Sequence, residues 1–208
     1  MQFAFTEEQI MIRDSAESFL AEVSTSHAVR AAMVTEAGYD AELWRSLCRD
    51  LGWQSTTIPE NYGGLGLGFV ELVALQEQMG RFLLCAPFFS TVCCGINALL
   101  VAGTEAQKAE YLPQINNGMT ATLAFVGNAA AQNGGQWHAA AVDAIYEQQG
   151  DTFVLNGTLR YVVDGASSEL LIIAARQKNS TGENGISLFV VCAATAGIER
   201  KPTPAMDQ

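Results

Sequence analysis

The feature that most constrains the fold is a change of pattern near Gly118. Before it, apolar residues recur at the three- and four-residue spacing of one helical face; after it, short apolar runs alternate with turn residues. The later runs are 120–126, 139–146, 153–155, 170–175 and 186–192. We therefore expect an α+β fold, with an N-terminal all-helical domain over 1–118 and a small antiparallel β-barrel or sandwich domain over 119–208.

Several helix boundaries are marked by local chemistry. Thr6-Glu-Glu-Gln9 and Thr104-Glu-Ala-Gln107 are capping boxes, in which a threonine oxygen and a glutamine side chain satisfy exposed amides at a helix start. Asp40 is placed to cap another helix, which Gly52 is expected to terminate. These signals predict a succession of helices up to residue 118.

Composition excludes several classes of function. The 208 residues carry a net charge of −11, with 49% hydrophobic and 16% charged residues, as in a globular protein. An acidic surface repels phosphate backbones and anionic headgroups, so we expect no binding of nucleic acid or of a membrane surface. His27 and His138 lack metal-ligand spacing, and we expect no metal site.

Cysteine usage and one uncharged segment bear on the compartment. The five cysteines are an odd number without a C-x-x-C motif or a basic leader, which favours a reduced cytoplasmic compartment. Cys93-Cys94 is interpreted as two small apolar residues of a buried helix rather than a redox pair. The segment 82–103 has no charge, but Pro87 interrupts it, so we expect a break between two helices and no membrane span.

A glycine-rich stretch raises the question of a phosphate site. Ile58-Pro-Glu-Asn-Tyr-Gly-Gly-Leu-Gly-Leu-Gly68 has four glycines in six residues. A P-loop needs a Lys-Ser/Thr pair after the glycines, and a dinucleotide fingerprint needs a strand before them. Neither is present, so we expect a backbone corner between two helices, with Glu60 a solvated loop charge.

This stretch resembles the segment between early helices of the acyl-CoA dehydrogenase family. Further matches follow in the family's order over essentially the whole chain. They are Glu77-Gln-Met-Gly-Arg81, Gly103-Thr-Glu-Ala-Gln-Lys108, Tyr111-Leu-Pro-Gln-Ile-Asn-Asn-Gly118, Phe153-Val-Leu-Asn-Gly-Thr158 and Tyr161-Val-Val-Asp-Gly165.

The resemblance implies a flavoprotein that uses FAD. Members of the family bind FAD between the middle β domain and a C-terminal helical bundle, and a glutamate removes the α proton of an acyl-CoA thioester while the β hydrogen leaves as hydride. It implies that the cofactor is contacted by the backbone amides of Phe125, Val126 and Gly127 and by Tyr161 and Val163. It implies an acyl pocket lined by Phe88, Phe89, Ser90 and Thr91.

Three departures from the family pattern stand out. The Thr-Glu-Pro flavin signature is absent from the run 123–137, and the Trp-x-Thr motif corresponds to Tyr161-Val-Val163, so two hydroxyl donors are missing. The sequence ends at Gln208, where the family would enter its C-terminal bundle, which ordinarily carries the catalytic glutamate. We therefore nominate no catalytic residue. Tyr161 fits either an ordinary strand position or a flavin contact.

Three hypotheses remain open. The first is a subunit of an acyl-CoA dehydrogenase in truncated form, inactive as the isolated chain. The second is a non-catalytic or half-site partner in a heteromeric enzyme, such as those that act on steroid side chains. The third is a flavin oxidase or monooxygenase on the same scaffold. We expect an acyl-CoA substrate, an electron-transfer acceptor (oxygen in the third case) and a homo- or hetero-oligomer, because uncovered apolar faces favour association.

Overall fold

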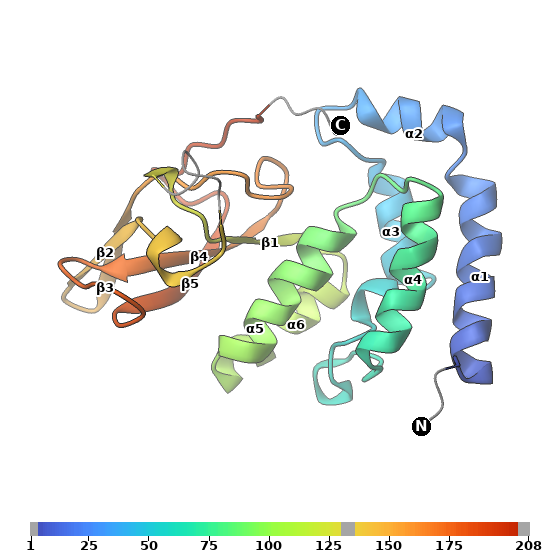
Figure 1. Cartoon of the computed structure of the whole chain (residues 1–208), viewed down its shortest axis with the longest axis horizontal. Helices are drawn as coiled ribbons and strands as arrows, with labels where there is room; N and C mark the ends of the chain where they lie inside the picture. The colour runs from blue at the N-terminus through green and yellow to red at the C-terminus, as the bar shows by residue number, and fades with distance from the viewer. Residues whose placement is uncertain (1–3, 130–135, 204–208) are drawn as a thin grey trace.

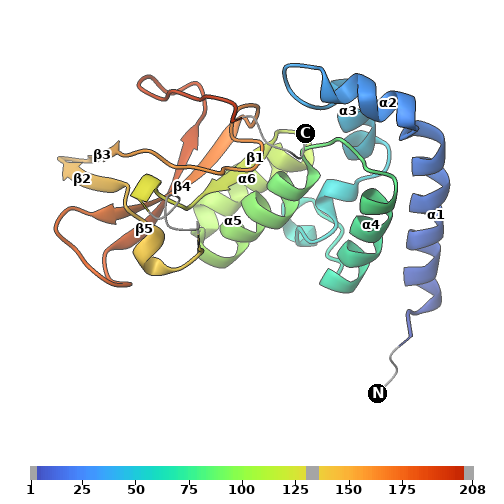
Figure 2. The ribbon, with the colours of Figure 1, turned by 45° about the horizontal axis from the view of Figure 1, so that its top comes forward.

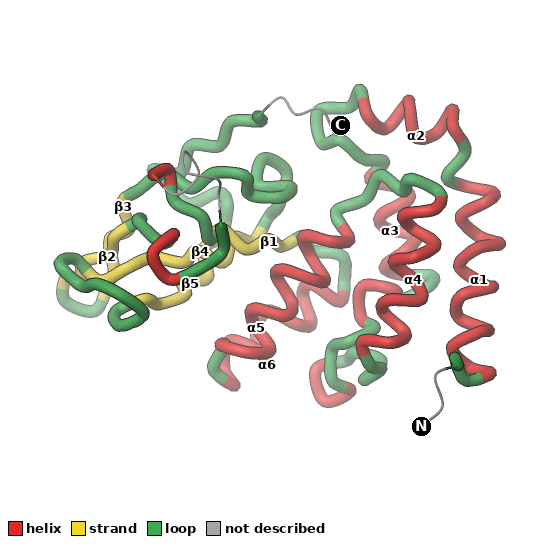
Figure 3. The backbone as a smooth tube through the Cα atoms, in the orientation of Figure 1, coloured by secondary structure: helices red, strands yellow, loops and turns green. Residues whose placement is uncertain are grey.

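The computed structural model describes residues 4–129 and 136–203, and within these ranges the α-helices and the π-helix precede the strands. Figure 1 shows the two groups side by side, and Figure 3 shows the same division by structural class. The helices are α1 (Glu7–Val23), α2 (Ser26–Met33), α3 (Ala41–Arg49), α4 (Phe69–Arg81), the π-helix η3 (Phe89–Ile96), α5 (Asn97–Ala102) and α6 (Glu105–Asn116). Three short 3₁₀ helices are Trp53–Ser55, Glu60–Tyr62 and Ala139–Ala141. The α+β expectation is confirmed.

The predicted helix caps are present. Thr6 and Thr104 both form complete capping boxes, with each threonine Oγ1 accepting from the amide three residues on at 3.2 Å. Asp40 Oδ1 accepts from the amides of Glu42 and Leu43 at the start of α3. Gly52, just after α3, adopts the left-handed φ of 64°.

The uncharged segment folds as a break followed by a helix, as predicted. α4 ends at Arg81, the chain passes Pro87, and η3 then runs directly into α5. The first eight residues of this second helix have π geometry, which sequence spacing did not indicate. No helix in residues 4–129 or 136–203 has the length and apolar character needed to cross a membrane.

The glycine-rich corner uses its own amides. Those of Gly63, Gly64, Leu65, Gly66 and Leu67 donate to backbone oxygens between residues 55 and 60. The amide of Gly68 donates to Glu71 Oε2 at 2.9 Å. No amide of this run remains to cradle a phosphate, which confirms the corner and its structural role. Asn116 Nδ2, at the end of α6, donates to the Gly63 carbonyl at 2.7 Å and fixes the corner against that helix.

The sheet is organised around β4. Its strands are β1 (Ala121–Ala124), β2 (Ile145–Gln149), β3 (Thr152–Asn156), β4 (Leu170–Gln177) and β5 (Ile186–Cys192). One edge of β4 pairs antiparallel with β5 along its length; the other pairs in parallel with β1 over Leu170–Ile173 and with β2 at Arg176 and Gln177. The sheet is therefore mixed, not wholly antiparallel. Long connections allow this, because β1 and β4 are separated by two further strands in the sequence.

The hydrophobic core continues from the helices into the sheet. The buried cluster contains Leu20, Trp44, Leu75 and Ile96 from the helices together with Ala121, Leu170 and Ile172 from β1 and β4. Trp44 Nε1 also donates to the Gly118 carbonyl, between α6 and β1, at 2.9 Å. Figures 1 and 2 both place α5 and α6 next to the sheet. A second, aromatic cluster of Tyr146, Phe153 and Phe189 lies among the outer strands.

Replacing Gly64 by alanine should destabilise the protein by about 2 kcal/mol, because overpacking a filled site typically costs 1–3 kcal/mol. A Cβ at Gly64 would lie 2.0 Å from the Ile58 carbonyl oxygen, a backbone atom. The matched control is Gly80→Ala in α4, where nothing lies within 4 Å and where alanine should stabilise the helix by roughly 0.5 kcal/mol. Urea unfolding of both variants measures the difference; equal stabilities would contradict a packed corner.

Candidate functional site

Three segments meet where the helices join the sheet, and we call this place the junction site. The first is 121–128, which contains β1; the second is 159–164; the third is the start of η3. Thr122 Oγ1 donates to the Val163 carbonyl at 2.7 Å, and the Arg160 amide donates to the Val126 carbonyl at 2.9 Å. With the antiparallel bridge of Gly127 to Leu159, these bonds align the second segment along the first.

The start of η3 is joined to both segments. Thr91 Oγ1 accepts from the Ala121 amide at 3.2 Å, and the Ser90 hydroxyl lies 2.6 Å from Asp164 Oδ2. Gly95 allows the helix to approach closely, since an added Cβ would lie 2.7 Å from the Ala121 Cβ. The position of η3 is thus fixed to β1 by packing and by hydrogen bonds.

The second segment and the start of η3 present apolar side chains to solvent. Tyr161 is 63% exposed, Val163 is 44% exposed and Phe89 is 54% exposed. Trp137 stacks on Phe125 with ring centroids 5.1 Å apart and planes 4° from parallel. Exposed apolar groups on converging segments are a common property of ligand and partner sites.

The backbone of the second segment is strained. Tyr161 has a φ of 58° and Asp164 a φ of 51°, in the left-handed region that bulky residues avoid. The amide of Gly165 donates to the Val162 carbonyl, and the amides of Ser167 and Ser168 donate to the Asp164 carbonyl. These bonds hold a conformation that costs about 1–3 kcal/mol per strained residue, a cost that is commonly found at functional sites.

The five predicted cofactor residues lie close together in the structure, but not all of their groups are free to contact a cofactor. Phe125 is half-buried and Val126 buried, beside the segment of Tyr161 and Val163. The Gly127 amide, expected to face a flavin ring, donates instead to the Ala141 carbonyl at 2.8 Å. That part of the prediction is corrected, because the Gly127 amide is occupied. A Cβ at residue 127 would lie 1.7 Å from Asp143 Oδ1.

Of the four residues predicted to line an acyl pocket, Phe89 alone exposes its side chain. Phe88 is buried in the core, and Ser90 and Thr91 are fully buried. The hydroxyls of Ser90 and Thr91 join η3 to the sheet, as described above. A direct substrate contact by Phe88, Ser90 or Thr91 would require a rearrangement, so the acyl-pocket prediction now depends on Phe89.

The remaining polar candidates are accounted for. Glu60, His27 and His138 are all exposed. In the described ranges no three His, Cys, Asp or Glu side chains gather as metal ligands would. Burial raises the pKa of Cys94 to about 11 and also raises that of Cys93, so both thiols stay protonated near neutral pH, in line with their interpretation as small helix residues.

Sequence reasoning missed Thr122 and Asp164. Thr122 lies inside a strand of apolar character, and nothing in its spacing indicated a bond to Val163. Asp164 belongs to the quoted run Tyr161-Val-Val-Asp-Gly165, and its acidic side chain beside an aromatic motif was the available signal.

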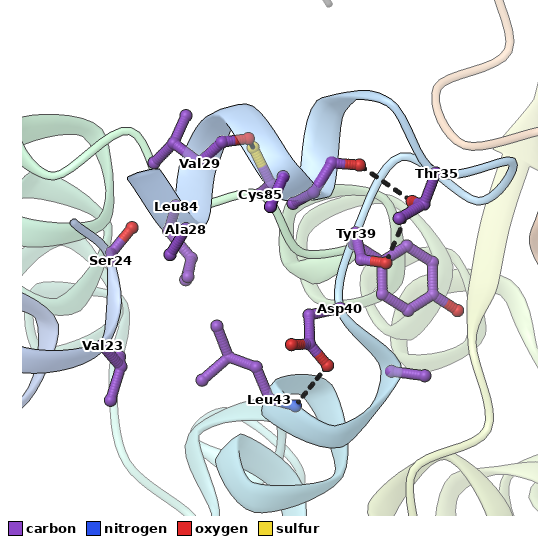
Figure 4. A pocket seen from close by; sticks show the side chains of 13 residues that line it. Val23, Ser24, Ala28, Val29, Thr35, Tyr39, Asp40, Leu43, Leu84 and Cys85 are labelled. Atoms are coloured by element: carbon purple, nitrogen blue, oxygen red, sulfur yellow. Dashed lines mark hydrogen bonds between the residues drawn. The ribbon is translucent and has the colours of Figure 1, made fainter. Parts of the chain in front are cut away.

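A cavity of about 490 Å³ lies elsewhere, between α1, α2, α3 and Leu84-Cys85 (Figure 4). Its lining is mostly Ala, Val and Leu. The polar groups in it are already bonded within the protein: Ser24 Oγ to the Phe82 carbonyl, Thr35 Oγ1 to the Ala32 carbonyl, and Asp40 to the start of α3. A specific ligand site needs convergent polar groups that are free to bond the ligand. The side chains of Ser24, Thr35 and Asp40 are not free, because each is already bonded within the protein.

Comparison with known proteins gives a consistent set of relatives. The family description "Acyl-CoA dehydrogenase, N-terminal domain" matches residues 6–119. Mitochondrial isovaleryl-CoA dehydrogenase from Arabidopsis thaliana is 30% identical over 194 residues, which cover 90% of this chain and 45% of that protein.

Solved structures show the same fold. The ChsE4-ChsE5 complex from Mycobacterium tuberculosis matches with a TM-score of 0.79 and 26% identity over 96% of this chain and 50% of that chain. An acyl-CoA dehydrogenase complexed with FAD from Bacillus anthracis matches with a TM-score of 0.80 and 23% identity over 97% of this chain and 34% of that chain. The chain thus spans half or less of the length of these proteins.

Replacing Thr91 by valine should destabilise the protein by about 1–3 kcal/mol, because it leaves the buried Ala121 amide without its acceptor. The control is Thr57→Val, since Thr57 Oγ1 is buried without a hydrogen-bond partner in the described part of the chain. That control should be neutral or stabilising. Chemical denaturation of the two variants compares them; a Thr91→Val variant as stable as the control would contradict the proposed joint between η3 and β1.

Proposed function

The chain belongs to the acyl-CoA dehydrogenase family, and from this premise we propose that its junction site forms one part of a flavin site at which an acyl-CoA thioester is dehydrogenated between its α and β carbons. The observation that carries the proposal is the position of Tyr161 and Val163. They occupy the place of the family's Trp-x-Thr motif, and they are exposed on a strained segment beside β1.

The residues present fit the faces of a flavin better than its polar edge. An isoalloxazine ring is flat and largely apolar, which suits the exposed Tyr161 and Val163 and the stacked pair Phe125 and Trp137. The edge of the ring needs donors, and here Val163 replaces a hydroxyl while the Thr122 hydroxyl donates to the Val163 carbonyl. The Tyr161 hydroxyl is a remaining donor at this position.

The positions of the exposed side chains suggest a role for each residue. Tyr161 and Val163 would hold the cofactor, and Phe89 at the start of η3 would contact the acyl chain. When bound, FAD supplies a hydride acceptor, whose electrons then pass to an electron-transfer acceptor. The role of this chain is to orient the reactants and to exclude water from the reacting bond.

The proton must be removed by a group outside the described residues. The carboxylates on the segment 159–164 and shortly after it are Asp164 and Glu169. Asp164 is bonded to Ser90, and Glu169 Oε2 accepts from the Thr120 amide at 3.0 Å. A general base must reach the proton that it abstracts, and both side chains are already engaged within the protein.

A half-site subunit of a heteromeric enzyme is the second candidate. The likeness to the ChsE4-ChsE5 complex favours it, as do the two hydroxyl donors missing from the flavin motifs. In that case Tyr161 and Val163 would face a flavin held mainly by a different, related subunit. Exposed apolar residues along α4 (Phe69, Val70 and Val73) support association with such a partner.

Restoring the missing hydroxyl should strengthen flavin binding. Val163→Thr is expected to tighten the Kd for FAD up to about tenfold, since a hydrogen bond contributes roughly 0.5–1.5 kcal/mol. Tyr161→Ala should weaken binding because it removes the ring. FAD titration of the assembled protein, followed by flavin fluorescence, measures both.

The matched control is Val101→Thr, which adds the same hydroxyl to a side chain that is 87% exposed on α5 and away from the junction. It should leave the Kd unchanged. If the assembled protein binds no FAD, or if Val101→Thr has the same effect as Val163→Thr, the junction is not the flavin site.

The chain alone should not oxidise acyl-CoA, because its junction lacks a free base. Adding the subunit or segment that supplies the base should produce turnover with an artificial electron acceptor. Following acceptor reduction and oxygen consumption together separates a dehydrogenase from an oxidase. Turnover by these 208 residues alone would contradict the proposed location of the base.

A further inference from the structure

A single hydroxyl lies between two acceptors at the start of η3. Ser90 Oγ is 2.6 Å from Asp164 Oδ2 and 3.1 Å from the Pro87 carbonyl oxygen. A serine hydroxyl carries one proton, so it donates to one of the two acceptors at a time. The other contact is favourable only if the second group supplies a proton of its own. A carbonyl has none, whereas a carboxyl group has one when it is neutral.

The arrangement is therefore fully satisfied in one protonation state. With Asp164 neutral, its O–H donates to Ser90 Oγ, and the Ser90 hydroxyl donates to the Pro87 carbonyl. With Asp164 ionised, the Ser90 hydroxyl turns to the carboxylate, and the Pro87 carbonyl keeps only the Thr91 amide at 3.1 Å. Ser90 is fully buried, so no solvent reaches it to fill the gap.

The surroundings favour the neutral state. Burial raises the pKa of Asp164, and a hydrogen bond donated by Ser90 acts in the opposite direction. The ionisable groups that respond to its charge are Cys94 of η3 and Tyr39 of the segment before α3. Burial is the main cause of the raised pKa of each, and the negative charge of Asp164 adds a smaller contribution in the same direction. Glu169, which follows this segment in the sequence, also raises the pKa of Tyr39. None of these groups is a cation that would stabilise an ionised Asp164.

We propose that Asp164 is a positioning residue, which donates its proton to Ser90 and thereby holds Tyr161 and Val163 in place for the flavin. This rests on the proposed function of the junction. Asp164 directly follows Val163, whose carbonyl accepts from Thr122, and its own left-handed backbone requires an anchor. Ionisation of Asp164 reverses this hydrogen bond, because the Ser90 hydroxyl must then leave the Pro87 carbonyl and donate to the carboxylate. The contact between this segment and η3 is thereby rearranged, and with it the placement of the two exposed side chains.

The first experiment needs no flavin. The ¹³C carboxyl shift of Asp164 is titrated in the chain alone and in Ser90→Ala. If the neutral carboxyl donates to Ser90, removing this acceptor destabilises the neutral form, and the titration midpoint shifts to lower pH. A shift to higher pH would show that Ser90 is the donor to a carboxylate, and would overturn the proposal.

The pH dependence of folding stability independently checks the direction in which folding shifts the pKa of Asp164. A carboxyl whose pKa is raised on folding stabilises the folded state fully below its unfolded value and loses this contribution as pH rises through the folded pKa. Wild type should therefore lose stability relative to Asp164→Asn over that window. Asp164→Asn keeps a neutral donor, so it serves even if Ser90→Ala fails to fold. A gain of wild-type stability with rising pH would contradict a neutral Asp164 carboxyl in the folded state.

The second experiment tests positioning. The Kd for FAD of the assembled wild-type protein should rise several-fold as pH increases through the Asp164 midpoint, together with a shift of the bound-flavin absorbance. Asp164→Asn should remove both changes, and Asp164→Ala should bind weakly at every pH. A wild-type Kd that follows the same pH profile as Asp164→Asn would refute the positioning role. Complete absence of FAD binding would refute the proposed function instead, while the carboxyl titration would still report on the hydrogen bond.

Discussion

The rest of the structure depends on the close contact between η3 and β1. Gly95 lets the helix approach Ala121, where a side chain as small as a methyl group would collide, and the Thr91 hydroxyl accepts the Ala121 amide at the same place. Because the buried cluster continues across this contact to Leu170 and Ile172, helices and sheet share one core. A shared core restricts relative movement of the two parts far more than a polar interface would. The segment 159–164 is built on this contact, since it is bonded to β1 by Thr122 and reaches η3 through Asp164.

Much of the helical half could be predicted from sequence because its signals are local. A capping box involves four consecutive residues, and the glycine corner could be separated from a phosphate loop by the residues directly before and after it. The features that could not be predicted depend on partners far apart in the chain. The parallel pairing of β1 with β4 joins residues about 49 positions apart, and the π geometry of η3 is invisible to a spacing pattern read over a short uncharged run. Ser90 and Thr91 were assigned to a pocket for the same reason, since only the fold reveals that their hydroxyls point to Asp164 and Ala121.

If the junction holds a flavin as proposed, the hydroxyls missing from the flavin motifs and the strained turn of 159–164 would have different consequences for it. A ring is positioned by the shape of the surface against which it lies, and that surface is determined here by the strained turn and by stacking of Trp137 on Phe125. The electron affinity of the ring depends on donors at its edge, and those are the groups that are missing. Under the proposed function, such a chain would supply the shape of a flavin site while contributing little to the redox potential, which would suit a subunit whose partner supplies the polar contacts.

The strain at Tyr161 supports a role for this geometry in a site rather than in folding alone. An asparagine or glycine would adopt a φ of 58° at lower cost, and the side chain contributes little to the core because it is 63% exposed. A bulky aromatic residue in that conformation, facing solvent, is unfavourable twice: its backbone is strained, and its ring is hydrated. Both costs are offset when a flat apolar partner covers the ring. Removing the ring from water is then favourable, and the turn needs no further conformational change because it already has the bound conformation. The ring at Tyr161 is thus best explained by something that lies against it.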